Sequence, residues 1–204
     1  MLVFALVIAA YAAAIVFTGG RIFAPNLAES FQARPWGIYP HAFFGGVALA
    51  LGAFQFHRGI LARHRSRHRL MGKIYLIAAL TSGAAGFYMS FYSFGGIVTH
   101  LGFGLLAVAT LTTTSLAYIA IRRREIAVHR EWMIRSYALI FAAVTLRIEL
   151  PLLTALFQEF APAYRIVAWS CWIPNLVVAE LLIRRRRGPA LDREVLALAR
   201  SELA

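Results

Sequence analysis

Six apolar runs follow one another along the chain, and each is long enough to cross the roughly 30 Å hydrocarbon core of a bilayer as a helix. They lie near residues 2–19, 41–61, 70–92, 97–121, 132–156 and 164–183. Of the 204 residues 60% are hydrophobic and only 15% are charged, a composition that excludes an ordinary soluble domain. The sequence therefore predicts an all-α polytopic membrane protein, a six-transmembrane-helix bundle. We expect its second to fifth helices to form a four-helix core, with the uncharged first helix packed at the periphery.

Positive charge is concentrated between the apolar runs. Of the 21 Lys and Arg residues, 17 fall within Arg58–Lys73, Arg122–Arg135 and Arg184–Arg200. Short loops rich in Lys and Arg stay on the cytoplasmic side of a membrane. This bias predicts that both termini are cytoplasmic, with a single transmembrane domain over residues 1–187 and a cytoplasmic tail over 188–204. Because the net charge of +12 follows these loops, it indicates the lipid bilayer as a partner and argues against nucleic acid.

Four histidines stand at the starts of apolar runs. His41 and His100 begin the second and fourth runs at the predicted external end, whereas His68 and His129 lie at the cytoplasmic end of the third and fifth. Titratable side chains within spans are costly and mark a functional site by default. Two facing imidazoles are what a six-coordinate haem iron needs. The pattern predicts two b-type haems, with these four histidines as metal ligands.

Small or flexible side chains follow each of these histidines by four residues, which is one turn along the same helix face. They are Gly45, Gly72, Gly104 and Met133. Glycine leaves room beside a ligand for a porphyrin, and methionine is flexible enough to lie against a ring edge. We therefore include all four among the predicted cofactor-binding residues.

Polar side chains near the two histidine pairs complete the predicted cofactor sites. Gln55 lies close in helical phase to His41, and Tyr75 shares a face with His68. Haem carboxylates need cations, and four arginines are candidates: Arg69, Arg130 and Arg135 near the inner pair, and Arg147 near the outer pair.

Arg147 lies inside the fifth run, roughly 27 Å along the helix from His129. An arginine in a span needs a partner. Glu149 is two residues away, on the other side of the helix, and is not placed to provide one. We expect Arg147 to face the bundle and to bind an anion or a polar side chain.

Two other classes of function fit the same residues. In a haem-free protein, an inner chamber and an outer chamber would bind or transport a small polar or anionic molecule. The inner chamber would be lined by Gln55, His68, Tyr118 and His129, and the outer one by His41, His100 and Arg147. In an accessory subunit of a membrane complex, the buried polar groups would only specify helix packing. The sequence holds no phosphate-binding glycine loop, nucleophile elbow or His-Glu-x-x-His motif. It therefore indicates no particular enzymatic activity, and the question of activity stays open.

Residues 38–180 resemble the bacterial membrane proteins grouped as domain of unknown function 2306 (DUF2306). The resemblance rests on His41 with its following glycines, Gln55, His68-Arg69 with Gly72 and Tyr75, His129-Arg130 with Trp132-Met133, Arg135-Ser136 and Arg147. It implies a multi-pass protein of the bacterial inner (plasma) membrane and brings no established activity.

The placing of histidines on four consecutive spans is similar to the layout of cytochrome b561. That similarity implies axial pairs formed by His41 with His100 and by His68 with His129. It implies transmembrane electron transfer through two b-type haems, with a quinone or another redox membrane protein as partner.

Overall fold

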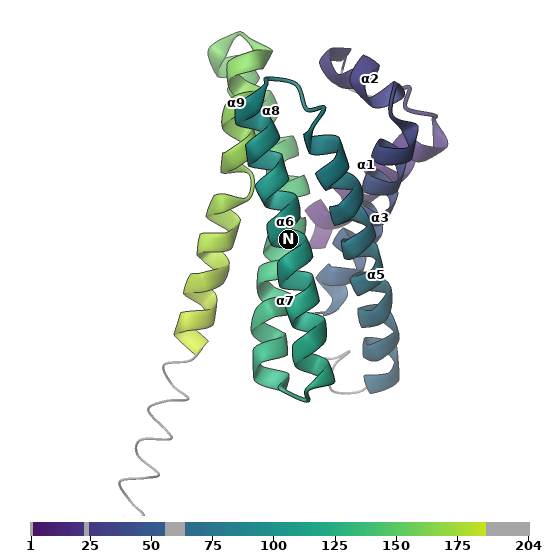
Figure 1. Cartoon of the computed structure of the whole chain (residues 1–204), viewed down its shortest axis with the longest axis vertical. Helices are drawn as coiled ribbons and strands as arrows, with labels where there is room; N and C mark the ends of the chain where they lie inside the picture. The colour runs from purple at the N-terminus through teal and green to yellow at the C-terminus, as the bar shows by residue number, and fades with distance from the viewer. Residues whose placement is uncertain (1, 23–24, 56–63, 187–204) are drawn as a thin grey trace, which may run out of the picture.

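The computed structural model describes residues 2–22, 25–55 and 64–186, and the regular elements in this part of the chain are all helices (Figure 1). Five helices are long and apolar enough to cross a membrane: Pro35–Gln55, Arg65–Ser90, Ile97–Arg122, Ile126–Phe157 and Phe160–Arg186. The predicted all-α, multi-pass architecture is confirmed. The predicted tail over 188–204 and the end of the second predicted run lie outside the described residues.

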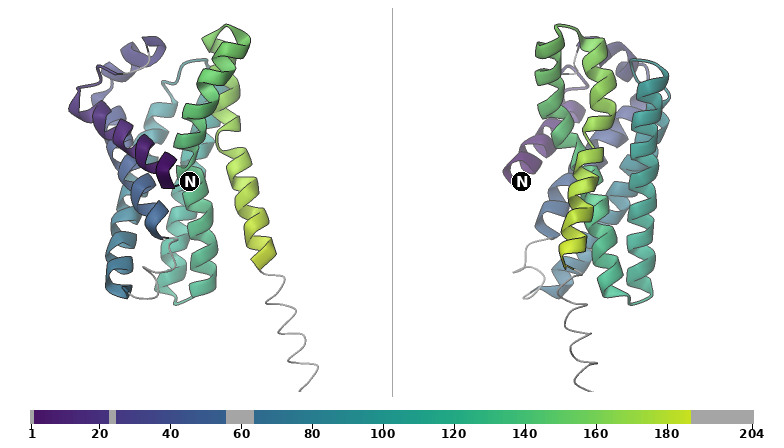
Figure 2. Two further views of the ribbon diagram at one scale, coloured as in Figure 1. Left: turned by 180° about the vertical axis from the view of Figure 1, so that it is seen from behind. Right: turned by 90° about the vertical axis from the view of Figure 1, so that its left-hand side faces the viewer.

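The first predicted span is shorter than expected, so a count of six crossings is not confirmed. Helix α1 (Leu2–Phe17) is apolar but has 16 residues, fewer than the roughly 20 that a crossing needs. The chain turns after it, because Gly19 and Gly20 adopt positive φ angles of 60° and 78°. The chain's N-terminal end lies near mid-height of the bundle (Figure 2). The short α2 (Pro25–Gln32) follows this turn.

The central bundle consists of α3 (Pro35–Gln55), α5 (Arg65–Ser90), α6 (Ile97–Arg122) and the consecutive helices α7 (Ile126–Ile140) and α8 (Ala142–Phe157). Helix α1 packs on α3, and α9 (Phe160–Ser170) packs on α6 and α8. Helix α3 begins six residues before the predicted run, with Pro35 in its first turn, where a missing N–H costs nothing.

Two helices of the bundle are interrupted midway. The fifth span breaks at Phe141, and the last span breaks after α9 and resumes over residues 173–186. Pro174 explains the second break, because it has no N–H to donate to the preceding turn. The Asn175 amide links the two breaks by donating to the carbonyls of Cys171 at 3.0 Å and Ala138 at 3.3 Å.

The described members of the three basic clusters lie at one end of the bundle. They include Arg65–Arg69 at the start of α5, Arg122–Arg124 at the end of α6 and just beyond it, and Arg184–Arg186 at the end of the last helix (lower end in Figure 1). We call this the basic end. The far end holds the α5–α6 turn at 91–96 and the α8–α9 turn at 158–159. The side of the membrane that each end faces stays a prediction.

Glycines bring the helices close enough to shape the interior. A Cβ on Gly46 of α3 would lie 3.1 Å from the side chain of Ala12 in α1. A Cβ on Gly102 of α6 would lie 2.8 Å from the carbonyl oxygen of Ala168 in α9. Such contacts between small residues are the usual means of helix association in membranes. The first of them holds α1 against the bundle, where it forms one wall of the cavity described next.

Candidate functional site

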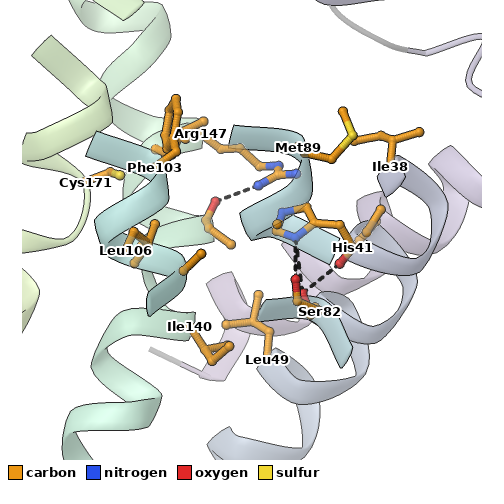
Figure 3. A pocket seen from close by; sticks show the side chains of 18 of the residues that line it. Ile38, His41, Leu49, Ser82, Met89, Phe103, Leu106, Ile140, Arg147 and Cys171 are labelled. Carbon is orange, nitrogen blue, oxygen red and sulfur yellow. Dashed lines mark hydrogen bonds between the residues drawn. The ribbon is translucent and has the colours of Figure 1, made fainter. Parts of the chain in front are cut away.

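A cavity of about 320 Å³ lies inside the bundle towards the far end. Its volume is at the lower end of the range for ligand pockets, roughly 300–1,000 Å³. Helices α1, α3, α5, α6, α7 and α8 all contribute to its walls. Most of the lining is apolar, as at Leu49, Phe103, Leu106 and Ile140 (Figure 3). Polar side chains therefore occupy only a few positions in the described wall of the cavity.

His41 is held in a defined orientation by α5. Its Nδ1 lies 3.0 Å from the carbonyl oxygen of Ser82, which can only accept, so Nδ1 carries the hydrogen. The Ser82 hydroxyl donates in return to the carbonyl of His41 at 2.9 Å. A Cβ on Gly86 would lie 2.9 Å from the imidazole Nδ1, so glycine lets the ring approach α5. In the neutral ring, Nε2 is left with a free lone pair.

Arg147 turns its guanidinium into the same cavity, beside His41 (Figure 3). Its Nη1 donates to the carbonyl of Ala143 at 2.9 Å, and its Cζ lies 5.1 Å from the centre of the Tyr11 ring. The expectation that Arg147 faces the bundle is confirmed. Among the residues that the structure describes, no carboxylate lies within ion-pair distance of it.

Glu149 is engaged elsewhere, as the sequence predicts. Its carboxylate accepts a hydrogen bond of 2.6 Å from the Ser170 hydroxyl of α9. Within the described part of the cavity wall, Arg147 is the only residue with a formal charge when His41 is neutral. The cavity thus carries a single positive charge, with no counter-charge from the described residues.

Two residues of this site are absent from the predicted set. Tyr11 belongs to the run expected to be a peripheral packing helix, yet its ring lies over Arg147 and its hydroxyl donates to the carbonyl of Ile22. Ser82 shares a helix face with His68, fourteen residues earlier, but a serine in a span is too common to mark a site. In both cases the role depends on how closely two helices approach, which periodicity does not give.

The structure does not bring His41 and His100 to one site. His100 Nε2 lies 3.0 Å from the carbonyl oxygen of Ser93, to which it donates, and His100 is not among the residues that line the cavity. Its Nε2 is therefore occupied in this arrangement. The assignment of these two histidines as an axial pair stays a prediction.

The glycines that follow the histidines differ in what they face. A Cβ on Gly45 would lie 2.9 Å from the Ser82 hydroxyl, and one on Gly104 would lie 3.3 Å from the Ser90 hydroxyl. The space beside these two glycines is thus taken by serines of α5. A Cβ on Gly72 would meet no atom within 4 Å. Of these three glycines, and counting only the described residues, Gly72 alone has the open space that the haem hypothesis expects.

His68 and His129 both lie at the basic end, near the starts of α5 and α7. His129 Nδ1 donates to the carbonyl of Ala117 at 2.8 Å, which leaves its Nε2 with a lone pair. Nδ1 of His68 is buried and has no hydrogen-bond partner among the residues that the structure describes. Gln55 donates to the backbone carbonyl of His68 at 3.3 Å, so this predicted residue supports the same site.

Tyr75 and Met133 are core residues. The Tyr75 hydroxyl lies 2.8 Å from the Ser136 hydroxyl, which in turn lies 2.8 Å from that of Thr114. This buried chain of hydroxyls joins α5, α6 and α7. Met133 is 8% exposed and packs in the same core cluster.

The remaining predicted arginines are not free cations inside the bundle. Arg135 forms two hydrogen bonds with the Glu180 carboxylate, one of them 2.9 Å long, and lies over the Trp132 ring. Arg69 and Arg130 are exposed at the basic end. Their assignment to haem carboxylates stays a prediction, but Arg135 already has a protein carboxylate as partner.

The fold and the cavity define a multi-pass helical membrane protein with an interior space of ligand size. The chain belongs to the DUF2306 family of predicted membrane proteins, whose family model matches residues 38–183. The matched range contains His41, Arg147 and both predicted histidine pairs, whereas Tyr11 lies before it. No curated protein and no solved structure matches the chain.

Proposed function

We propose that the protein binds a small anionic molecule in the cavity beside Arg147 and His41. The observation that carries this proposal is the Arg147 guanidinium, which faces the cavity without an acidic partner among the described residues. An arginine at the centre of a span costs about 2.5–3.5 kcal/mol on the mild insertion scale. A bound anion supplies the missing charge and offsets that cost.

The neighbours of Arg147 prepare it for such a ligand. Ala143 takes one of the five guanidinium N–H groups and Tyr11 covers the cation with a π face, so the other N–H groups remain for an anion. His41 presents its Nε2 lone pair to the same space. The site therefore combines several donors with one acceptor.

Thermal unfolding in nanodiscs of zwitterionic lipid tests the proposal. Acetate, formate, nitrate and chloride should be titrated as sodium salts. At least one of them should raise the Tm in a saturable manner, because a ligand that binds only the folded state stabilises it. Arg147→Met should abolish the response. The matched control is Arg165→Met, which removes an exposed arginine that bonds the carbonyl of Gly95 outside the cavity. Equal responses in all three proteins would refute the proposal.

We also propose an orientation, in which the basic end faces the cytoplasm of a bacterial inner membrane. The support is the gathering of the described basic clusters at one end, as the positive-inside rule requires. The cavity then lies in the external half of the bundle. Helix α1 is a sixth, shorter apolar segment that starts near mid-height and runs towards the far end, so we assign the N-terminus, like the C-terminus, to the cytoplasmic side.

The placement of His68 and His129 at the same end of the bundle favours a second candidate function, electron transfer across the membrane through a b-type haem. Within the described part of the chain, the residues fit this group on three counts: Nδ1 of His68 is buried without a partner, Nε2 of His129 keeps a lone pair, and there is open space beside Gly72. A bound haem would supply one-electron chemistry. The Ala117 carbonyl would fix the tautomer of His129. A quinone or another redox membrane protein would be the partner.

The residues at the outer pair do not fit a second haem in this arrangement. His100 has its Nε2 on the carbonyl of Ser93, and Ser82 fills the space beside Gly45. We therefore assign no electron step to His41 or His100.

An absorption spectrum of the purified protein, oxidised and then dithionite-reduced, tests the haem candidate. It predicts a Soret band that His68→Ala and His129→Ala both remove, because axial ligation needs both imidazoles. His64→Ala is the matched control, since His64 is an exposed histidine just before α5. A spectrum without a Soret band from haem-supplied cells would exclude this candidate and leave the anion site standing.

A further inference from the structure

We infer that the anion is a monocarboxylate with an apolar body, such as a short- or medium-chain fatty acid or an aromatic acid. This inference rests on the proposed function, since it names the class of ligand that the cavity beside Arg147 accepts. Three properties of the cavity carry it: its charge, the state of its imidazole and the nature of its walls.

The charge of the cavity matches a single negative charge. Arg147 is the only formally charged residue in the described lining, so a dianion would bring a second charge without a partner. Burying an unpaired charge is very costly. The planar guanidinium also pairs well with a planar carboxylate through parallel N–H bonds. A carboxylate is therefore favoured over a phosphate monoester or a dicarboxylate.

The state of His41 points the same way. Its Nδ1–H is engaged by the Ser82 carbonyl, so the neutral ring offers a lone pair to the cavity rather than a second donor. That lone pair repels a further anionic oxygen and accepts a hydrogen bond from a neutral hydroxyl or water. The imidazole thus limits the ligand to one charged group, held at Arg147.

The walls away from Arg147 and His41 are suited to hydrocarbon. Leu49, Leu106 and Ile140 lie opposite the two polar side chains (Figure 3), and other lining residues are also largely apolar. An inorganic anion would leave these walls without contacts. An apolar body fills them and gains the free energy of leaving water. The ligand should therefore be amphipathic, with its charge at one end.

The experiment compares four probes that differ in one property each, by thermal unfolding in phosphatidylcholine nanodiscs. Octanoate has one charge and an apolar chain, and octanol has the chain without the charge. Suberate has the same number of carbons and two charges, and acetate has the charge without the chain. Octanoate should raise the Tm at concentrations at least tenfold lower than acetate, whereas octanol and suberate should have little effect.

Variants separate binding in the cavity from effects on the bilayer. Arg147→Met should lose the response to octanoate, and Arg165→Met should keep it. Arg147→Lys retains the charge without the fork of donors, so it should weaken the response by about tenfold and should serve if the methionine variant does not fold. A response to octanoate that all variants share would be a bilayer effect and would overturn the inference.

The outcomes distinguish the two proposals. If acetate stabilises through Arg147 and octanoate is no better, the anion site stands and the apolar ligand is wrong. If no probe acts through Arg147, both proposals fail. Nanodiscs with added phosphatidylglycerol form the last arm. If this lipid stabilises the protein through Arg147 and octanoate does not, the ligand is a phospholipid headgroup. That result would overturn the carboxylate assignment.

Discussion

Arg147 has unusual surroundings for an arginine in a membrane span. Arginines at such depth usually pair with an acid or reach the interface. Here the neighbours are the carbonyl of Ala143 and the ring of Tyr11, and the nearest acid along the chain, Glu149, bonds Ser170. An unpaired Arg147 lowers the stability of the empty protein, and the simplest explanation for its presence is that it binds a ligand.

Removal of this charge should therefore stabilise the empty protein. We expect Arg147→Met to raise the free energy of unfolding by about 1–3 kcal/mol, because the unpaired charge is removed and an apolar side chain replaces it. Denaturant unfolding without added anions measures the change. Arg165→Met should stay within about 0.5 kcal/mol of the parent, as exposed sites do. A clear loss of stability in Arg147→Met would mean that the arginine has a structural role.

The sequence was enough to predict the placement of some of these residues and not others. The cost of an unpaired charge in a span correctly directed Arg147 into the bundle, and the basic loops correctly placed His68 and His129 at the same end. The bond from His41 to Ser82 and the contact of Tyr11 with Arg147 depend on the approach of two helices. Sequence periodicity contains no such distance.

At the scale of the helices, glycines have two different roles that the sequence does not distinguish. A Cβ on Gly52 of α3 would collide with the ring of Tyr137 and lie 2.9 Å from that of Tyr75, whereas one on Gly72 of α5 would meet nothing within 4 Å. Gly52 thus lets α3 approach α5 and α7. Gly72 leaves open space beside the His68 site.

A matched pair of alanine substitutions tests this difference. Gly52→Ala should destabilise the protein by about 1–3 kcal/mol, because overpacking forces the two tyrosine rings to move. Gly72→Ala should be neutral or stabilise by up to about 1 kcal/mol, since alanine is the better helix former and has room. Unfolding of both variants in one detergent gives the comparison. Similar losses in both would show that the two glycines pack alike.

The interruptions of helices were predictable only where a residue signals them. Pro174 marks the break in the last span, but no proline or glycine lies within four residues of Phe141. The break at Phe141 is instead bonded to the neighbouring helix, through the Asn175 amide, which donates to the carbonyl of Ala138 and the hydroxyl of Thr145. The predicted crossing by the first run is not confirmed, because helix α1 ends at Phe17 and the chain then turns at Gly19 and Gly20.

At the scale of the whole molecule, charge decides the orientation in the membrane. Ser66 is exposed at the basic end and Glu159 is exposed at the far end. The test uses two single-cysteine variants in a Cys171→Ala background and an impermeant thiol reagent. Ser66→Cys should be labelled only after the cells are opened, whereas Glu159→Cys should be labelled in intact cells. An N-terminal epitope should behave as Ser66→Cys does. The reverse pattern would invert the topology and place the cavity on the cytoplasmic side.

The most direct measurement of the central claim is a crystal structure of the full chain grown with 4-bromobenzoate, with anomalous data collected at the bromine edge. This probe has one carboxylate and an apolar body that does not react with histidine. We predict a bromine peak among Leu49, Leu106 and Ile140, with the carboxylate on the guanidinium of Arg147. A cavity without bromine at saturating ligand, with Arg147 paired to a protein acid instead, would contradict the account.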